Sequence, residues 1–338
     1  MHNHLRQPDH KRNQALETLL AELNRDLCRA AECLPAEIER PRLPQVFVVG
    51  CPRSGTTLVY QWLAATGLFT YPTNFVARFP AAPWVGERIL LLLSDPAYDF
   101  NRELTDHLPA TPPSFTSRLG KTRGLTAPHE FWYWWRRFLP ERETHALSPG
   151  DLAGLDGPTM LRELAAWEAV RNQPLTMKGL ILNWNLPWLA EMLPDAIFIH
   201  IRRDPYLTMQ SLLDARRDFF RDMREWYSFR PPQYPDLKDL DPAMQVAGQV
   251  WHTDQAVAAG LAQLPNRRKI EVDYEEFCRR PGGVYTRLVQ CLAAVNHPVD
   301  PLYTGPASFP ARCDVRLSPT EKAALDSAWD TVSASGVI

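Results

Sequence analysis

A short segment near residue 50 combines glycine, hydroxyl and arginine side chains at a spacing that could bind an anion. Gly50 and Gly55 are separated by four residues, and Thr56 and Thr57 follow directly. Glycine lets backbone N–H groups turn onto an anion, and a helix that begins here adds its partial positive charge. A triphosphate-binding loop carries lysine immediately before its last hydroxyl residue. Here Thr56 takes that place, and the positive charge lies three residues earlier at Arg53.

A second group of candidate phosphate ligands begins where another apolar run ends. Ala196–Ile201 leads into Arg202 and Arg203, and Ser211 lies eight residues after Arg203. An arginine at a strand end and a serine two turns into the next helix can both reach one phosphate, because guanidinium and hydroxyl groups both donate hydrogen bonds. His200 ends the apolar run and is interpreted as a histidine satisfied inside the core.

Together these segments resemble the sulfotransferase superfamily. Pro52-Arg53-Ser54-Gly55-Thr56-Thr57 is similar to that family's 5′-phosphosulfate loop. Arg203-Asp204-Pro205 with Ser211 is similar to its 3′-phosphate motif. The resemblance implies that Arg53, Ser54, Gly55, Thr56, Thr57, Arg203 and Ser211 bind the donor 3′-phosphoadenosine 5′-phosphosulfate (PAPS). Arg202 is then a solvated or salt-bridged neighbour, although the two arginines could exchange roles.

The resemblance covers roughly residues 44–295 and includes a third, weaker match. Val272-Asp-Tyr-Glu-Glu-Phe277 is similar to a stretch that follows a late strand in the family. It implies a position for Tyr274 near the nucleotide, with a purely structural tyrosine as the alternative. In its overall style the chain is closest to bacterial sulfotransferases of unassigned acceptor.

The reacting groups are less completely matched than the donor ligands. Sulfuryl transfer needs cations on the oxygen that leaves and a base for the nucleophile. Arg53 and Lys178 are the candidate cations, with Thr57 as a hydroxyl donor. Lys178 resembles the lysine that precedes the catalytic histidine in many small-molecule sulfotransferases, but Leu180 stands where that histidine is expected. A surface position for Lys178 is the alternative.

His129 and Glu130 are the candidate replacements for the missing base. Related branches use a glutamate, and a histidine titrates in the useful range. Glu130 is expected at the start of an aromatic helix, where burial would raise its pKa, or where it would only favour the helix dipole. A simple helix start is the alternative for both residues. The reaction requires no metal, and the sequence contains no metal-ligand cluster.

Tryptophans are concentrated in the segments expected to border the sulfate. Some of them must belong to the core, and the remainder could line a pocket for a bulky apolar or carbohydrate acceptor. The five residues concerned are Trp132, Trp134, Trp135, Trp184 and Trp188. The substrate-loop segment Tyr71–Arg78 lacks the glutamate of the tyrosylprotein branch, so we expect a small-molecule, lipid or carbohydrate acceptor.

The elements that must position these residues alternate between strands and helices, which predicts an α/β fold with a P-loop-like central parallel sheet flanked by helices. The predicted strands are 45–49, 175–178, 196–201 and 269–273. The predicted helices are 13–33, 56–65, 84–93, 129–139, 158–171, 180–193, one from 205 through 212, 242–263, 282–295 and 319–334.

Composition sets the outer limits of the protein. The chain has 338 residues, 45% hydrophobic, with a net charge of −2, which gives no general attraction to nucleic acid. The six cysteines show no CxxC pair and are expected to be reduced and mostly buried. No apolar leader is visible, and runs such as Ile89–Leu93 are too short to cross a bilayer. A cytoplasmic protein is expected.

The expected organisation is an N-terminal helix and linker over residues 1–43 and a single α/β domain over 44–338. The 31 prolines predict long irregular segments, with a substrate-covering insertion over about 69–172.

Two other functional hypotheses remain. A P-loop kinase or NTPase would bind ATP and magnesium, but Thr56 and the Arg203/Ser211 pair argue against it. A catalytically silent nucleotide-binding protein of the same fold stays open because of Leu180.

Overall fold

A computed structural model describes residues 3–99, 101, 103 and 114–335. Its described part contains a parallel sheet of four strands in the order β2-β1-β3-β4. The strands are β1 Val46–Gly50, β2 Thr176–Lys178, β3 Ile197–Arg202 and β4 Lys269–Asp273. The predicted α/β class and all four predicted strands are confirmed.

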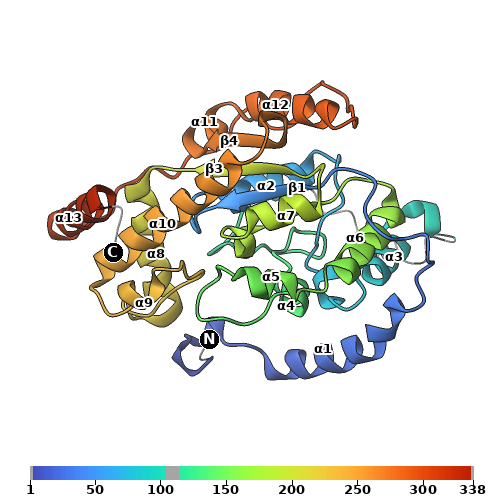
Figure 1. The fold of residues 1–338 in the computed structure, drawn as a ribbon, viewed down its shortest axis with the longest axis horizontal. Helices are drawn as coiled ribbons and strands as arrows, with labels where there is room; N and C mark the ends of the chain where they lie inside the picture. Colours follow the sequence, from blue (N-terminus) through green and yellow to red (C-terminus); the bar gives the residue numbers. More distant parts are fainter. Residues whose placement is uncertain (1–2, 100, 102, 104–113, 336–338) are drawn as a thin grey trace.

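Helices cover both faces of this sheet (Figure 1). The α-helices of the described chain are α1 Gln14–Leu27, α2 Thr56–Ala65, α3 Pro83–Ser94, α4 Trp132–Phe138, α5 Pro149–Ala153, α6 Gly157–Arg171, α7 Leu186–Met192, α8 Pro205–Phe220, α9 Tyr234–Leu237, α10 Pro242–Ala262, α11 Tyr274–Arg279, α12 Pro281–Ala294 and α13 Pro319–Ser335.

The core is divided by the sheet because successive strand residues point to opposite faces. Phe47 and Val49 pack into a cluster with residues of α3, α4, α6 and α7. Val46 and Val48 pack into a second cluster with residues of α2, α11 and α12. In Figure 1, α11 and α12 lie at the top of the view and α4, α5 and α6 in its lower half, with the sheet between them.

The strand order places a topological switch beside β1. The chain passes from β1 to β2 on one side and then returns to β3 on the other. In open parallel sheets, ligands bind outside the carboxyl ends of the strands at such a switch. The register pairs Gly50 with Ile201 and Val48 with Lys178, so the predicted anion loop, Arg203 and Lys178 all follow the same edge.

Three predicted helices differ from the observed ones. The aromatic helix begins at Trp132 instead of residue 129, because Phe131 is left-handed at φ 56. The predicted helix 180–193 is a short 3-10 helix, Leu180–Leu182, followed by α7, because Pro187 lacks an N–H and fits only a first helical turn. The predicted N-terminal helix 13–33 is α1, which ends at Leu27, followed by a 3-10 helix, Cys28–Ala31. α1 has no fully buried residue, and Leu19 on its predicted apolar face is 62% exposed.

Other features of the chain complete the comparison. Cys51, Cys278 and Cys291 are buried, whereas Cys28, Cys33 and Cys313 are exposed, so the expectation of mostly buried thiols holds for only half of them. Residues 100, 102 and 104–113 of the predicted insertion lie outside the described residues. No helix in the described ranges is both long enough and apolar enough to cross a membrane.

Candidate active site

The loop between β1 and α2 has the backbone conformation that an anion cradle needs. Gly50 has φ +134, and a Cβ there would lie 2.6 Å from the carbonyl oxygen of Ile201, so the sheet requires glycine. Arg53 and Gly55 are both left-handed, with φ 72 and 98. The Ser54 hydroxyl closes the turn by donating to the Cys51 carbonyl at 2.8 Å. These turns bring the loop to the start of α2, where helix N–H groups are free for an anion.

The second predicted motif meets this loop directly. Arg53 Nε donates to the Ser211 hydroxyl of α8 at 3.1 Å, and Arg203 Nη1 donates to the Arg53 carbonyl at 3.0 Å. Burial is the main reason that the pKa of Arg53 lies below its usual value, and the nearby charges of Arg203 and Arg312 lower it further. The structure therefore gathers several guanidinium groups that an anion would stabilise.

One donor of Arg203 is still available in this cluster. Its Nε is buried and makes no hydrogen bond within the described part of the chain, and Glu275 Oε1 lies 3.8 Å away. Buried guanidinium donors normally make hydrogen bonds, and this one has only the long ion pair with Glu275, so it can still donate to a ligand. The residues present thus fit a phosphate held by Arg203 and Ser211.

Tyr274 connects the two motifs. It is the first residue of α11 and is 5% exposed. The Arg203 guanidinium stacks over its ring at 4.9 Å from the centroid. A Cβ on Gly55 would lie only 2.2 Å from its Cδ2 atom, so the ring packs directly on the loop. Tyr274 is therefore placed where it supports both the loop and Arg203.

A separate contact group lies at the end of β2. Lys178 Nζ donates to the Thr57 hydroxyl at 3.0 Å and forms an ion pair with Glu130 Oε1. The Lys178 side chain is 4% exposed, which contradicts the surface-lysine alternative. Thus a cation, a carboxylate and a hydroxyl meet beside the first turn of α2.

Glu130 is held as a carboxylate by its surroundings. Burial alone would raise its pKa, but the ammonium of Lys178 and the hydrogen bonds from Lys178 and Trp132 outweigh it, so the pKa lies below its ordinary value. The Trp132 indole Nε1 donates to Glu130 Oε2 at 2.5 Å. The expectation of a raised pKa at a helix start is wrong, because Glu130 precedes the helix and has a cationic partner.

His129 has a different environment from its neighbour. Its Nδ1 accepts a hydrogen bond from the Phe131 backbone N–H at 2.9 Å. Burial lowers its pKa to about 4. A neutral imidazole with Nδ1 as acceptor carries its proton on Nε2, so neither nitrogen is free to accept another proton. The structure brings Glu130 to the Lys178 group and commits the His129 ring to the backbone.

Leu180 stands where the family's histidine is expected, and its apolar side chain cannot act as a base. It lies in the 3-10 helix after β2, is 4% exposed, and belongs to the core cluster that contains Phe47. His200 is also buried, with Nε2 3.1 Å from Asp254 Oδ1, and the exposed Arg202 lies beside the same carboxylate. These two residues therefore have the core and surface positions that their sequence contexts predict.

Lys178, Glu130 and Thr57 are called the reactive group below. Two further residues lie near this group, and no pattern in the sequence indicated them. A Cβ on Gly120, at φ +81, would lie 3.5 Å from Thr57 Oγ1 and 3.6 Å from Glu130 Oε1. The Tyr227 hydroxyl donates at 3.3 Å to the carbonyl of Leu119, the residue before Gly120. The charges of Arg53 and Glu130 both act on the Tyr227 phenol. Their proximity arises from long loops, which no local pattern encodes.

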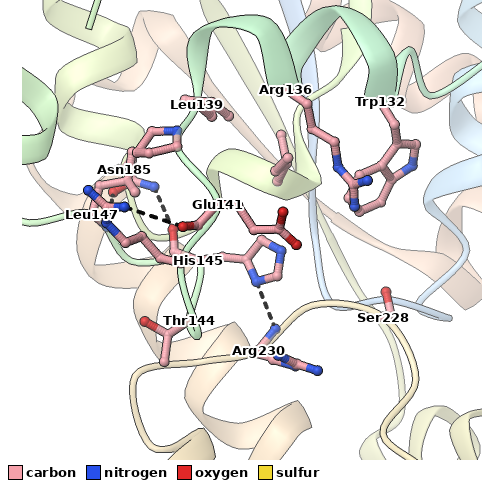
Figure 2. A pocket seen from close by; sticks show the side chains of 13 residues that line it. Trp132, Arg136, Leu139, Glu141, Thr144, His145, Leu147, Asn185, Ser228 and Arg230 are labelled. Carbon is pink, nitrogen blue, oxygen red and sulfur yellow. Dashed lines mark hydrogen bonds between the residues drawn. The ribbon is translucent and has the colours of Figure 1, made fainter. Parts of the chain in front are cut away.

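The tryptophans are divided between core and cavity. Trp134 and Trp135 are fully buried in the core, and Trp184 and Trp188 pack against it. Trp132 alone of the five predicted residues lines the cavity in Figure 2, which has a volume of about 170 Å³. The cavity walls are α4, the segment 139–147, residues near Asn185 and the loop 228–230.

Comparisons with known proteins identify the family of the chain. The model of the sulfotransferase family matches residues 44–294. Omega-hydroxy-beta-dihydromenaquinone-9 sulfotransferase Stf3, from Mycobacterium bovis and from Mycobacterium tuberculosis, is 24% identical over 264 residues, which cover 74% of this chain. The match spans only 62% of the length of these curated relatives.

A solved structure shares the fold. The crystal structure of sulfotransferase STF1 from Mycobacterium tuberculosis H37Rv superposes with a TM-score of 0.52 and 17% sequence identity. The superposition covers 93% of this chain and 80% of that one. At this identity the likeness concerns the fold alone, and it supports the P-loop-like parallel sheet described above.

Proposed function

This chain belongs to the sulfotransferase family, and we propose that it transfers a sulfuryl group from PAPS to a hydroxyl or amine of a small-molecule, lipid or carbohydrate acceptor. The observation that carries this proposal is the contact of Lys178 with both Thr57 and Glu130 beside the anion loop. The relatives named for omega-hydroxy-beta-dihydromenaquinone-9 support a lipid-like alcohol as one acceptor class.

The proposed donor site combines the two phosphate motifs. Arg53, Ser54, Gly55, Thr56 and Thr57 hold the 5′-phosphosulfate with the loop and the start of α2. Arg203 and Ser211 hold the 3′-phosphate, and Tyr274 supports them. When bound, the donor supplies the sulfuryl group and the leaving phosphate oxygen. The Nε of Arg203 makes no hydrogen bond among the described residues, which supports this assignment, because a 3′-phosphate gives it an acceptor.

The proposed chemistry uses an ionised base and fixed cations. Glu130, whose lowered pKa keeps it a carboxylate at neutral pH, removes the proton of the acceptor hydroxyl. An ammonium has three N–H donors, and Lys178 uses two of them on Glu130 and Thr57. The third is available for the charge that develops on the leaving oxygen, together with Arg53. His129 is then a positioning residue for the turn before α4.

The proposal is tested by following label from sulfur-labelled PAPS into a panel of alcohols, phenols, sugars and hydroxylated quinones. We expect wild-type product on at least one class. Glu130→Gln should lower kcat by about a hundredfold or more, since general base catalysis contributes that much. His129→Gln should stay within about tenfold of wild type, because its ring takes no proton in this scheme.

Glu130→Gln and His129→Gln serve as controls for each other. Both substitutions remove one titratable side chain from the same turn, so a general disturbance of the turn would affect them alike. Wild-type turnover by Glu130→Gln contradicts the assignment of the base. Absence of labelled product from every acceptor class, with the wild-type protein folded, contradicts the transfer itself.

A further inference from the structure

The cavity beside α4 lies close to the proposed base. Two chain segments each join the reactive group to the cavity wall. In the first, Glu130 contacts Lys178 and Trp132 lines the cavity. In the second, Tyr227 interacts with Arg53 and Glu130, and Arg230 lines the cavity. The Trp132 indole links the cavity wall to Glu130, because it lines the cavity and its Nε1 donates to Glu130 Oε2.

Each of the two segments contains a strained, left-handed residue that the surrounding packing must hold in place. Phe131 lies between Glu130 and Trp132 and has φ 56, and Ser228 follows Tyr227 with φ 74. Left-handed backbone at non-glycine residues is strained and persists only where the surroundings hold it. The rings of Trp132 and Phe229 stack at 4.8 Å, which locks the two segments together. The cavity is therefore a fixed neighbour of the reactive group.

Arginine is the dominant charged residue in the cavity. Arg136, Arg142 and Arg230 line it, against one lining carboxylate, Glu141. Arg142 is already neutralised, because its Nη2 lies 2.6 Å from Asp151 Oδ1 outside the cavity. Among the described residues, Arg136 and Arg230 form no ion pair; they stack instead on Trp132 at 5.3 Å and on Tyr234 at 4.5 Å.

His145 adds a neutral donor to this wall. Its Nδ1 accepts from the Arg230 backbone N–H at 3.1 Å. Burial lowers its pKa to about 4, so the ring is neutral at pH 7 and carries its proton on Nε2. Figure 2 shows the ring between Arg230 and Glu141, among the residues that line the cavity. The cavity thus offers hydrogen-bond donors from Arg136, Arg230 and His145 to an oxygen-rich group.

Charge balance points to the kind of group that fits. Arg136 and Arg230 contribute two positive charges and Glu141 one negative charge, so a single anion makes the site neutral. Arg136 and Glu141 are exposed and Arg230 is half-buried, and a bound anion would make charge-assisted hydrogen bonds with the two guanidinium groups. A volume of about 170 Å³ is below the range for a whole drug-sized ligand, and is suited to one ring or one anionic group.

We propose that this cavity binds a monoanionic oxygen group, a carboxylate or a sulfate ester, that the acceptor carries in addition to the hydroxyl to be sulfated. The inference rests on the proposed function, because it treats the cavity as a subsite next to Glu130. The Trp132 ring, which stacks on Phe229 and on the Arg136 guanidinium, holds Arg136 in place, and Arg136 and Arg230 bind the anion. Charge at this position then selects among alcohols of similar shape.

Benzoate and benzamide provide a direct test, because they have nearly the same shape and differ in charge. We expect wild-type protein to bind benzoate roughly tenfold more tightly than benzamide in ligand-observed NMR titrations, since hydrogen bonds between charged groups are the stronger ones. Arg136→Gln and Arg230→Gln should each reduce this ratio to about threefold or less. Arg142→Gln, on the same rim but paired with Asp151, is the matched control and should keep the wild-type ratio.

Binding of 3′-phosphoadenosine 5′-phosphate (PAP) to the same proteins separates the possible failures. All three variants should bind it like wild type, which also shows that they are folded. If wild-type protein binds PAP but treats benzoate and benzamide alike, or binds neither, the anion subsite is wrong and the proposed function stands. If wild-type protein does not bind PAP, the proposed function itself fails. An equal loss of discrimination in Arg142→Gln would also overturn the subsite, because it would indicate a general effect of rim charge.

Discussion

At the scale of single residues, the candidate site contains an ion pair between Glu130 and Lys178, whereas the position at which the family pattern has a histidine is apolar. Leu180 fills the histidine position and is buried in the core. Glu130 arrives from a turn more than forty residues earlier and contacts Lys178 at the end of β2. Under the proposed function, the pair supplies a base that is ionised at neutral pH and a cation that is shared with Thr57.

The pH dependence of the reaction follows from this pairing. The pKa of Glu130 is below its ordinary value of 4.5, so the carboxylate, which is the active form of a base, is present above that pH. For an aliphatic alcohol acceptor, kcat/KM should therefore be flat from about pH 5.5 to 8 and fall only in more acidic solution. An acid limb with its midpoint between about pH 6 and 7 would contradict Glu130 and indicate a group with the pKa of an ordinary histidine.

At the scale of elements, the site depends on two strand-to-helix connections. β1 leads through the anion loop into α2, and β3 leads through Arg203 into α8, where Asp204 caps the helix and Pro205 occupies its first turn. Gly55 is tightly constrained, because its φ of +98 and the ring of Tyr274 both exclude a side chain. We expect the loop to tolerate no Cβ there.

Gly55→Ala should weaken PAP binding by about tenfold or more and lower the melting temperature, because the new Cβ would displace Tyr274. Gly67→Ala is the matched control: Gly67 also has positive φ, at +72, but nothing lies within 4 Å of a Cβ there. It should cost about 1 kcal/mol of stability for the left-handed backbone and leave the affinity unchanged. Equal affinities for the two variants, measured by calorimetry, would show that the Tyr274 contact is irrelevant to the donor site.

The sequence predicted these two connections well because their signals are local. Apolar strands, glycine spacing and the Asp204-Pro205 helix start each depend on neighbouring residues. The predicted start of α4, at residue 129, is three residues too early, because the sequence around Phe131 does not indicate a left-handed residue. The contact between Lys178 and Glu130, and the approach of Gly120 and Tyr227, depend on tertiary packing of irregular segments, which periodicity does not report.

At the scale of the whole molecule, the strand order gathers residues from distant parts of the chain. β1 lies between β2 and β3, so the loop after β1 is flanked by Lys178 on one side and by Arg203 on the other. The proposed donor site and the proposed reaction site are therefore adjacent along one sheet edge. Tyr274, from the start of α11 after β4, completes the proposed donor site.

We propose that residues 44–338 form one domain and that residues 1–43 are an arm packed along the insertion over about 69–172. Glu17 of α1 accepts from the Tyr133 hydroxyl at 2.5 Å, and Asn24 donates to the Arg78 carbonyl at 2.9 Å. Figure 1 shows α1 along the lower side of the molecule, below α4 and α5. These contacts tie the arm to the segments that carry the proposed base and the cavity wall.

The central claim is that the chain holds a nucleotide bearing a 3′-phosphate, and calorimetry with PAP, adenosine 5′-phosphate and ATP tests it most directly. We predict that wild-type protein binds PAP about a hundredfold more tightly than adenosine 5′-phosphate, because Arg203 and Ser211 each contribute a hydrogen bond to the additional phosphate. Arg203→Ala should reduce this preference below about tenfold, while Arg202→Ala, its exposed neighbour, should retain it. Equal binding of the two nucleotides by wild-type protein, or a preference for ATP with magnesium, would contradict the account.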